Sequence, residues 1–199
     1  MHLKDIEHEI VEEPLREWTK WMQEWSERTG ERPRVPVLQY WDDEGNETVM
    51  PESNEINFFL DSVDGDPKFT PEEGSEAYME MMKWWSWCDN EMKPVLDLYK
   101  YGKDRHWDRE SNGKYMRELG TYIQKLEGHL SGRTHMIESR LTLTDIAIIP
   151  FIRQIMRVRN GEFDFTPYPR VTAWANSILE TDWFQNDVMK KRPLAEAGV

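Results

Sequence analysis

The feature that most constrains the fold is helical periodicity, which runs through the sequence from residue 75 onward. Apolar residues recur there at intervals of three and four positions, the spacing of one helix face. Four segments show this pattern: 75–101, 111–130, 142–159 and 168–179. A short final helix is expected at 182–191, and Pro94 is expected to interrupt the first segment because proline breaks the helical hydrogen-bond ladder. The sequence therefore predicts an all-helical domain over residues 75–199.

The first 63 residues have a different pattern, which favours a small α/β domain. Apolar and polar residues alternate over residues 6–12, as in a short strand. Two further strands are expected to form a hairpin: 35–40 and 47–50. Two helices are expected: one between Pro14 and Gly30, and one at 54–63. The Gly- and Pro-rich stretch 64–74 is the expected linker between the two domains.

Length, charge and cysteine content limit the class of protein. The 199 residues suffice for one large or two small domains. A net charge of -13 argues against binding to nucleic acid or to an anionic membrane surface, because both need clustered Lys and Arg. Cys88 is the only cysteine, so no internal disulfide can form. With neither a signal-peptide pattern nor an apolar run of the roughly 20 residues that span a bilayer, we expect a cytoplasmic protein.

A capping box is predicted at the start of the most apolar helical segment. The Thr142 hydroxyl can accept the backbone N–H of Asp145, and the Asp145 carboxylate can accept the backbone N–H of Thr142. Apolar residues then follow at helical spacing toward a core. We therefore interpret this pair as structural rather than catalytic.

Two short segments near the start of the chain have the chemistry of a peptide-binding site. Pro36 closes an expected strand, and an X–Pro bond there can be cis, which turns the N–H and C=O of Val35 outward for pairing with an extended peptide. Ser53 opens an expected helix, whose free N–H groups favour a ligand carboxylate. Glu52 can meet a ligand ammonium. A strand, a turn and a helix start without any ligand explain the same residues.

These two segments resemble the glutathione-binding half of a glutathione transferase, and the second half of the chain resembles the same superfamily. The run LTLTDIAIIPFIRQ at 141–154 is similar to the buried helix of the family's C-terminal domain. Residues 98–101, 167–174 and 183–184 are similar to its bacterial members. The resemblance covers about residues 6–191, and it implies a thioredoxin-like domain, truncated at its start, followed by an all-helical domain, usually in a homodimer.

The resemblance also implies roles for individual residues. Val35 would pair with the cysteinyl backbone of glutathione, and Pro36 would be the cis proline. Glu52 and Ser53 would hold the γ-glutamyl end, and Arg34 would lie near the glycyl end. Aromatic residues of the first helices in the second domain would line an apolar pocket for an electrophile, although aromatic residues at this spacing commonly pack inward instead. These residues are Trp84, Trp87, Tyr99 and Tyr101.

The chain departs from the family where the activating residue is expected. Family members carry a catalytic Tyr, Ser or Cys near the end of their first strand, whereas residues 6–12 here match the second strand. Three interpretations stay open: the chain is a fragment or has a misassigned start, residues 13–32 rebuild the missing layer, or the fold serves binding alone. Cys88 lies among Trp residues and beside Asp89, which disfavours a thiolate, so we do not expect it to replace the missing nucleophile.

The resemblance implies glutathione as the substrate and no metal. His106, His129 and His135 lack the spacing of metal ligands. We therefore predict a protein that binds glutathione and either conjugates it to a small apolar electrophile or reduces a glutathione mixed disulfide. The alternative is a non-catalytic module that keeps the fold for dimerisation or for docking a partner.

Overall fold

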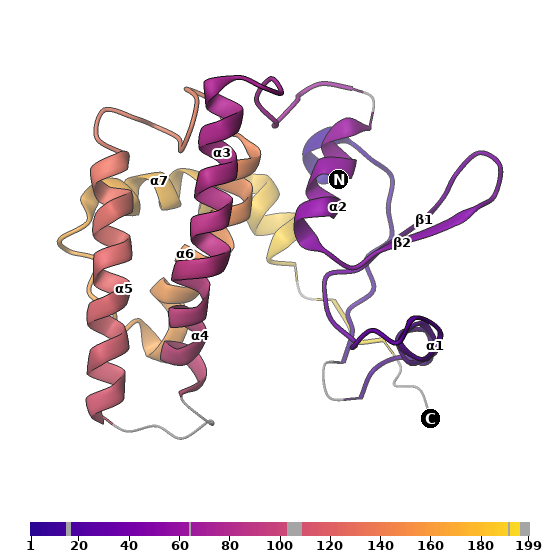
Figure 1. Ribbon diagram of the computed structural model, residues 1–199, viewed down its shortest axis with the longest axis horizontal. Coiled ribbons are helices and arrows are strands. Elements are labelled where there is room, and N and C mark those ends of the chain that lie inside the picture. The colour runs from indigo at the N-terminus through magenta and orange to yellow at the C-terminus, as the bar shows by residue number, and fades with distance from the viewer. Residues whose placement is uncertain (15–16, 64, 103–108, 191, 196–199) are drawn as a thin grey trace. The chain divides into compact units, whose positions relative to one another are not determined.

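A computed structural model describes residues 1–14, 17–63, 65–102, 109–190 and 192–195. The chain divides into two compact units (Figure 1). Unit 1 comprises Met1–Pro67 together with the segment that begins at Gln185, and unit 2 comprises Lys68–Phe184. A small α/β unit followed by an all-helical one confirms the expected fold class. The family boundaries expected from the sequence, 1–63 and 75–199, stay a prediction.

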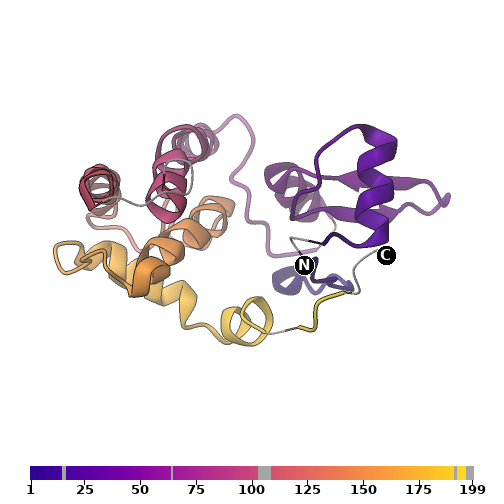
Figure 2. The same cartoon turned by 90° about the horizontal axis from the view of Figure 1, so that it is seen from below.

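Unit 1 contains one two-stranded sheet with helices beside it (Figure 2). Its elements are η1 (His2–Lys4), α1 (Lys20–Thr29), β1 (Leu38–Trp41), β2 (Glu47–Met50) and α2 (Ser53–Ser62). The strands are antiparallel, with Leu38 opposite Met50 and Trp41 opposite Glu47. The predicted hairpin is therefore present, although β1 starts at Leu38 rather than at Val35.

The prediction of a strand at residues 6–12 is wrong. Within the described part of the chain, this segment makes only an isolated parallel bridge, between Glu12 and Leu194. The Ala195 N–H donates to the Glu12 carbonyl at 2.8 Å. Ile10 and Val11 are 44% and 56% exposed, so the apolar alternation does not bury one face against a core.

The first helix starts later than predicted; side-chain hydrogen bonds fix its start, and a glycine ends it. Thr19 is the N-cap of α1, and its hydroxyl accepts the N–H of Met22 at 3.3 Å. The Glu13 carboxylate accepts the N–H and the hydroxyl of Thr19, at 3.1 and 2.6 Å. Gly30 ends the helix in the left-handed region, at φ 73°, a conformation that costs glycine little.

A buried lysine attaches the start of the chain to the last turn of α2. The Lys4 ammonium donates to the carbonyls of Asp61 and Gly65, at 2.9 and 3.0 Å. It also lies 3.8 Å from the Asp61 carboxylate, and both side chains are nearly fully buried. A cation near a helix C-terminus is favourable, because the carbonyl groups there carry partial negative charge.

Unit 2 is entirely helical in its described part, and its long helices pack against one another (Figures 1 and 2). Its elements are α3 (Glu76–Trp87), η2 (Cys88–Met92), α4 (Lys93–Tyr101), α5 (Arg109–His129), α6 (Leu143–Arg157), η3 (Val158–Asn160), α7 (Pro169–Leu179) and the start of η4 (Phe184–Val188). The final helix expected at 182–191 is shorter: it is α-helical at 182–183 and π-helical over Phe184–Val188, and residue 191 lies outside the described residues.

The interruption predicted at Pro94 takes the form of a π-helix. Cys88–Met92 joins α3 to α4, and the N–H of Lys93 bonds to the carbonyl of Cys88, five residues back. Proline has no N–H to donate, and its ring clashes with the carbonyl four residues before it. Widening the turn that precedes Pro94 accommodates the proline without ending the helix.

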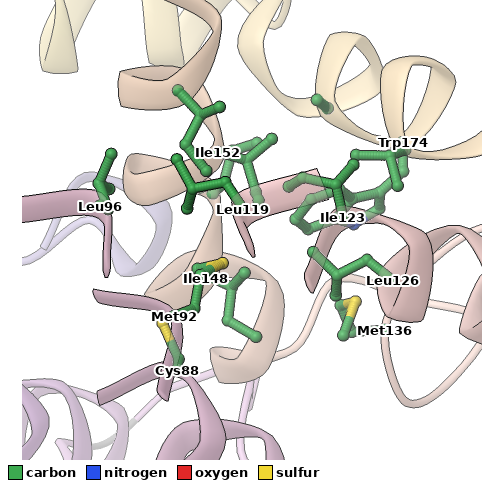
Figure 3. Packing of buried hydrophobic residues seen from close by; sticks show 14 of the residues in the cluster. Cys88, Met92, Leu96, Leu119, Ile123, Leu126, Met136, Ile148, Ile152 and Trp174 are labelled. Atoms are coloured by element: carbon green, nitrogen blue, oxygen red, sulfur yellow. The ribbon is translucent and has the colours of Figure 1, made fainter. Parts of the chain in front are cut away.

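The core of unit 2 is formed by apolar side chains from α3, η2, α4, α5, α6 and α7. Figure 3 shows Met92, Leu119, Ile148 and Trp174 of this cluster, which meet from helices far apart in the sequence. The Asp145 carboxylate is fully buried and accepts hydrogen bonds from four donors in three segments. The capping box that joins Asp145 to Thr142 is one part of this arrangement.

Candidate functional site

The two segments predicted to bind a peptide lie next to each other in unit 1. The Val35–Pro36 peptide bond is cis, and Val35 is 50% exposed. The β-ladder begins at Leu38, so the backbone of Val35 is outside it. Within the described residues, no hydrogen bond to the backbone of Val35 is recorded. These backbone groups are therefore available for an extended ligand.

An ion pair joins the two segments. The Arg34 guanidinium donates to the carboxylate of Glu52, eighteen positions later, and also to the carboxylate of Glu31. All three side chains are substantially exposed. The hydrogen bond to Glu31 and the charges of both carboxylates raise the pKa of Arg34, which stays protonated. The sequence did not indicate that Arg34 pairs with Glu52, because the contact depends on how the hairpin folds back.

The start of α2 completes this region. Glu52 is the N-cap, but its side chain makes no capping hydrogen bond to the helix, and Ser53 is the first helical residue. Both residues are exposed. The amides at such a helix start carry partial positive charge and favour an anion. The geometry therefore combines an outward-facing backbone, a helix start and a carboxylate shared with Arg34.

The four aromatic residues proposed for an electrophile pocket are placed differently from one another. Trp84, Trp87 and Tyr99 are at most 8% exposed and belong to the core cluster of unit 2. Tyr101 is 51% exposed near the end of α4, where the Lys100 ammonium lies 4.7 Å from its ring centre. A pocket lined by all four residues stays a prediction.

Cys88 is in an environment that disfavours a thiolate. Its side chain is buried in the core at the start of the π-helix. Burial, reinforced by the negative charge of Asp89, raises the pKa of the Cys88 thiol to about 12. A neutral, buried thiol is a poor nucleophile, so Cys88 acts as a core residue.

The histidines do not assemble with other ligands in the described part of the chain. No group of three or more His, Cys, Asp or Glu side chains there is arranged to hold a metal ion. His129 lies against the core, with Nε2 2.5 Å from the carbonyl of Met136 and Nδ1 3.8 Å from the Glu80 carboxylate. His135 is partly exposed, and His106 lies outside the described residues. Among the helices that the structure describes, none is long and apolar enough to cross a membrane.

Unit 2 also contains a groove that the sequence did not indicate. It has a volume of about 580 Å³ and lies between α5 and the segment before α7. Arg117, Gly120 and Gln124 line it from α5, at a spacing of three and four that places them on one helix face. That spacing was visible in the sequence, but nothing indicated which segment would face it.

Comparison with known proteins gives the class of protein. A family model for the glutathione S-transferase C-terminal domain matches residues 87–182. A bacterial glutathione transferase, BphK, solved as a ternary complex, superimposes with a TM-score of 0.71 at 18% identity, over 91% of this chain and 86% of that one. A glutathione transferase family member from Pseudomonas fluorescens, solved with two glutathione molecules bound, has a TM-score of 0.67 at 20% identity, over 77% and 70% of the two chains.

The chain thus has the fold seen in glutathione S-transferases, and residues 87–182 of its helical unit match the model of the glutathione S-transferase C-terminal domain. Among curated proteins, elongation factor 1-gamma of Carassius auratus is 24% identical over 155 residues, or 77% of this chain. This chain spans about a third of the length of the curated relatives it matches, 34% in each case.

Proposed function

We propose that the protein binds glutathione in unit 1, between the Val35–Pro36 turn and the start of α2. The observation that carries this proposal is the Arg34–Glu52 ion pair, because it places the two segments side by side. Val35 pairs with the cysteinyl backbone of the ligand. Ser53 and the adjoining amides receive the α-carboxylate of the γ-glutamyl group, and Glu52 receives its ammonium.

Support from related structures is of two kinds. The Pseudomonas fluorescens protein of similar fold was solved with glutathione bound. A protein from Pseudomonas putida, 18% identical with a TM-score of 0.65, was solved with glutathione disulfide. At these identities the likeness extends to the fold, so the assignment of this ligand to this chain depends on the residues at the site.

Calorimetric titration of the chain with glutathione tests the site directly. We expect binding in the micromolar to low-millimolar range, and Ser53→Ala and Glu52→Ala should each weaken it by about threefold to tenfold, the loss of one exposed charge-assisted hydrogen bond. Ser62→Ala is the matched control, because Ser62 lies at the opposite end of α2 and its hydroxyl bonds to the Phe59 carbonyl. Unchanged affinity in both site variants overturns the assignment.

Catalysis is a further part of the proposal. If the bound thiol is activated, the products are a thioether with a small apolar electrophile or the reduced partner of a glutathione mixed disulfide. Activation requires that the pKa of the glutathione thiol falls toward neutrality. The amides near Ser53 contact the γ-glutamyl end of the ligand, so they do not account for stabilising a thiolate on its cysteine. We propose a homodimer in the cytoplasm as the working form, in line with the single buried thiol, which needs no oxidising compartment.

The second candidate is a non-catalytic interaction module. The similarity to proteins named elongation factor 1-gamma favours it, since that name denotes a translation factor rather than a transferase. Two measurements distinguish these functions. One assays the conjugation of glutathione to several aryl halides and epoxides, and the other tests whether the protein captures a stoichiometric partner. A defined partner without conjugation supports the module, whereas turnover that is lost in Ser53→Ala supports the enzyme.

A further inference from the structure

The groove in unit 2 has an apolar floor and charged rims. Phe163 is 6% exposed and stacks on Tyr168, with ring centres 6.0 Å apart and an angle of 24° between the rings. Both residues line the groove together with Met116 of α5. Its volume of about 580 Å³ falls in the range of small-molecule sites, roughly 300 to 1,000 Å³.

A hydrogen bond joins the two walls of the groove. The Tyr168 hydroxyl donates to the Gly120 carbonyl at 3.3 Å. The hydroxyl of Tyr168 is thereby fixed against α5, and its ring faces the groove as an apolar surface.

Two opposite charges lie on the rims of this groove without neutralising each other. Arg117 and Asp164 both line it and both are exposed, yet they form no ion pair with each other. Among the described residues, no ion pair is recorded for either side chain. The Asp164 carboxylate accepts the Thr166 N–H at 2.9 Å, which fixes its position and leaves further acceptor sites. Hydrogen bonds from Thr166 lower the pKa of Asp164, so it is ionised at neutral pH.

Charge complementarity then defines the ligand. Asp164 would repel a ligand that carries only a negative charge, and Arg117 would repel one that carries only a positive charge. A zwitterion complements both side chains. We propose that this groove binds a free α-amino acid with a large apolar side chain, its carboxylate at Arg117, its ammonium at Asp164 and its side chain on Phe163 and Tyr168. Gln124, two turns further along α5, also lines the groove. This site is separate from the proposed glutathione site, which lies in unit 1.

Calorimetry with four probes tests the proposal: L-phenylalanine, N-acetyl-L-phenylalanine, L-phenylalanine amide and L-serine. We expect L-phenylalanine to bind, and each of the other three to bind at least about fivefold more weakly, since each lacks one charge or the apolar group. Arg117→Gln and Asp164→Asn each remove the charge but keep a polar side chain, and each should weaken the binding of L-phenylalanine by at least about fivefold. Arg157→Gln is the control, an exposed arginine of the same unit that does not line the groove.

Three results overturn the proposal. They are no binding of L-phenylalanine at about 10 mM, equal binding of the N-acetyl derivative, and affinity unchanged in both groove variants. Because glutathione is also a zwitterion, its titration is repeated with Arg117→Gln. If Arg117→Gln leaves the affinity for glutathione unchanged, glutathione does not bind in the groove. The failure of one proposal is then distinguishable from the failure of the other.

Discussion

At the scale of single residues, the Asp145 carboxylate joins three segments of the helical unit. One oxygen accepts the N–H of Met136 and the indole N–H of Trp174, each at 2.8 Å. The other accepts the N–H and the hydroxyl of Thr142, at 2.9 and 2.8 Å. The carboxylate is fully buried, and these four donors replace the water that it loses on folding.

We therefore expect Asp145→Ala to be strongly destabilising, because it leaves buried N–H groups of Met136, Thr142 and Trp174 without an acceptor. Unsatisfied buried donors cost about 1–3 kcal/mol each, so the free energy of unfolding should fall by at least about 3 kcal/mol. Thr142→Ala should cost about 1 kcal/mol, the typical effect of losing a cap. Urea unfolding followed by near-ultraviolet circular dichroism measures both.

The exposed Asp97 on α4 provides the control for this experiment. Asp97→Ala should change the free energy of unfolding by less than about 0.5 kcal/mol. A similar small effect for Asp145→Ala would show that the buried carboxylate is not what holds the three segments together.

The raised pKa of Cys88 predicts a protected thiol. At pH 8.5 we expect the folded protein to react with an aromatic disulfide reagent at least about a hundredfold more slowly than the urea-unfolded chain, because the unfolded thiol has a pKa of about 8.5 and the folded one a pKa of about 12. Fast reaction in the folded state would mean that Cys88 is accessible.

The same shift has a consequence for stability at high pH. A folded pKa above the unfolded value means that the Cys88 contribution is fully present below about pH 8.5 and is lost as the pH rises from there toward 12. Stability of the wild type should therefore fall more steeply between pH 8.5 and 10.5 than that of Cys88→Ala, which has no thiol to ionise. Parallel pH profiles for the two proteins would contradict this assignment.

At the scale of elements, a side chain from one helix caps the start of another. Glu127, near the end of α5, is 4% exposed. Its carboxylate accepts the N–H of Arg170 at 3.0 Å and the N–H of Val171 at 2.9 Å, both in the first turn of α7. The N-cap residue of α7, Tyr168, makes no side-chain capping hydrogen bond of its own. The negative charge also complements the helix dipole there.

Glu127→Gln should lower the free energy of unfolding by about 1 kcal/mol, since the amide oxygen still accepts a hydrogen bond but the charge is lost. Glu127→Ala should cost about 2–3 kcal/mol, because both amides of α7 then lack an acceptor. Glu180→Ala is the matched control, since Glu180 is exposed at the opposite end of α7, where a carboxylate opposes the dipole. Equal losses for Glu127→Ala and Glu180→Ala would exclude specific capping.

The helices were predictable from the sequence because each carries its own apolar face and some carry their own end signals. Thr142 with Asp145, and Gly30 after α1, are local signals, and α6 and α1 begin or end as they indicate. The strand expected at 6–12 failed because a strand depends on a partner elsewhere in the chain. The contact between Arg34 and Glu52, and the wall opposite Arg117, are likewise long-range and have no local signature.

At the scale of the whole molecule, the net charge of -13 is the dominant electrostatic feature. Exposed ion pairs such as Lys20–Glu24 and Arg28–Glu47 contribute about 0–1 kcal/mol each, and salt weakens them. Repulsion among the excess carboxylates acts across the folded surface, and salt weakens that as well. The sign of the salt dependence therefore shows which of the two effects is larger.

We expect repulsion to be larger, so the melting temperature should rise as NaCl increases from about 10 mM to about 0.3 M, where the screening length falls from roughly 30 Å to below 8 Å. The double variant Asp43→Lys with Asp97→Lys makes the net charge less negative at one exposed position in each unit. It should melt at a higher temperature than the wild type in low salt and should gain less from added NaCl. Screening by salt weakens attraction and repulsion alike, so the larger of the two decides whether the melting temperature rises or falls. A melting temperature that falls with salt in the wild type would instead mean that attraction within local ion pairs outweighs the repulsion from the net charge.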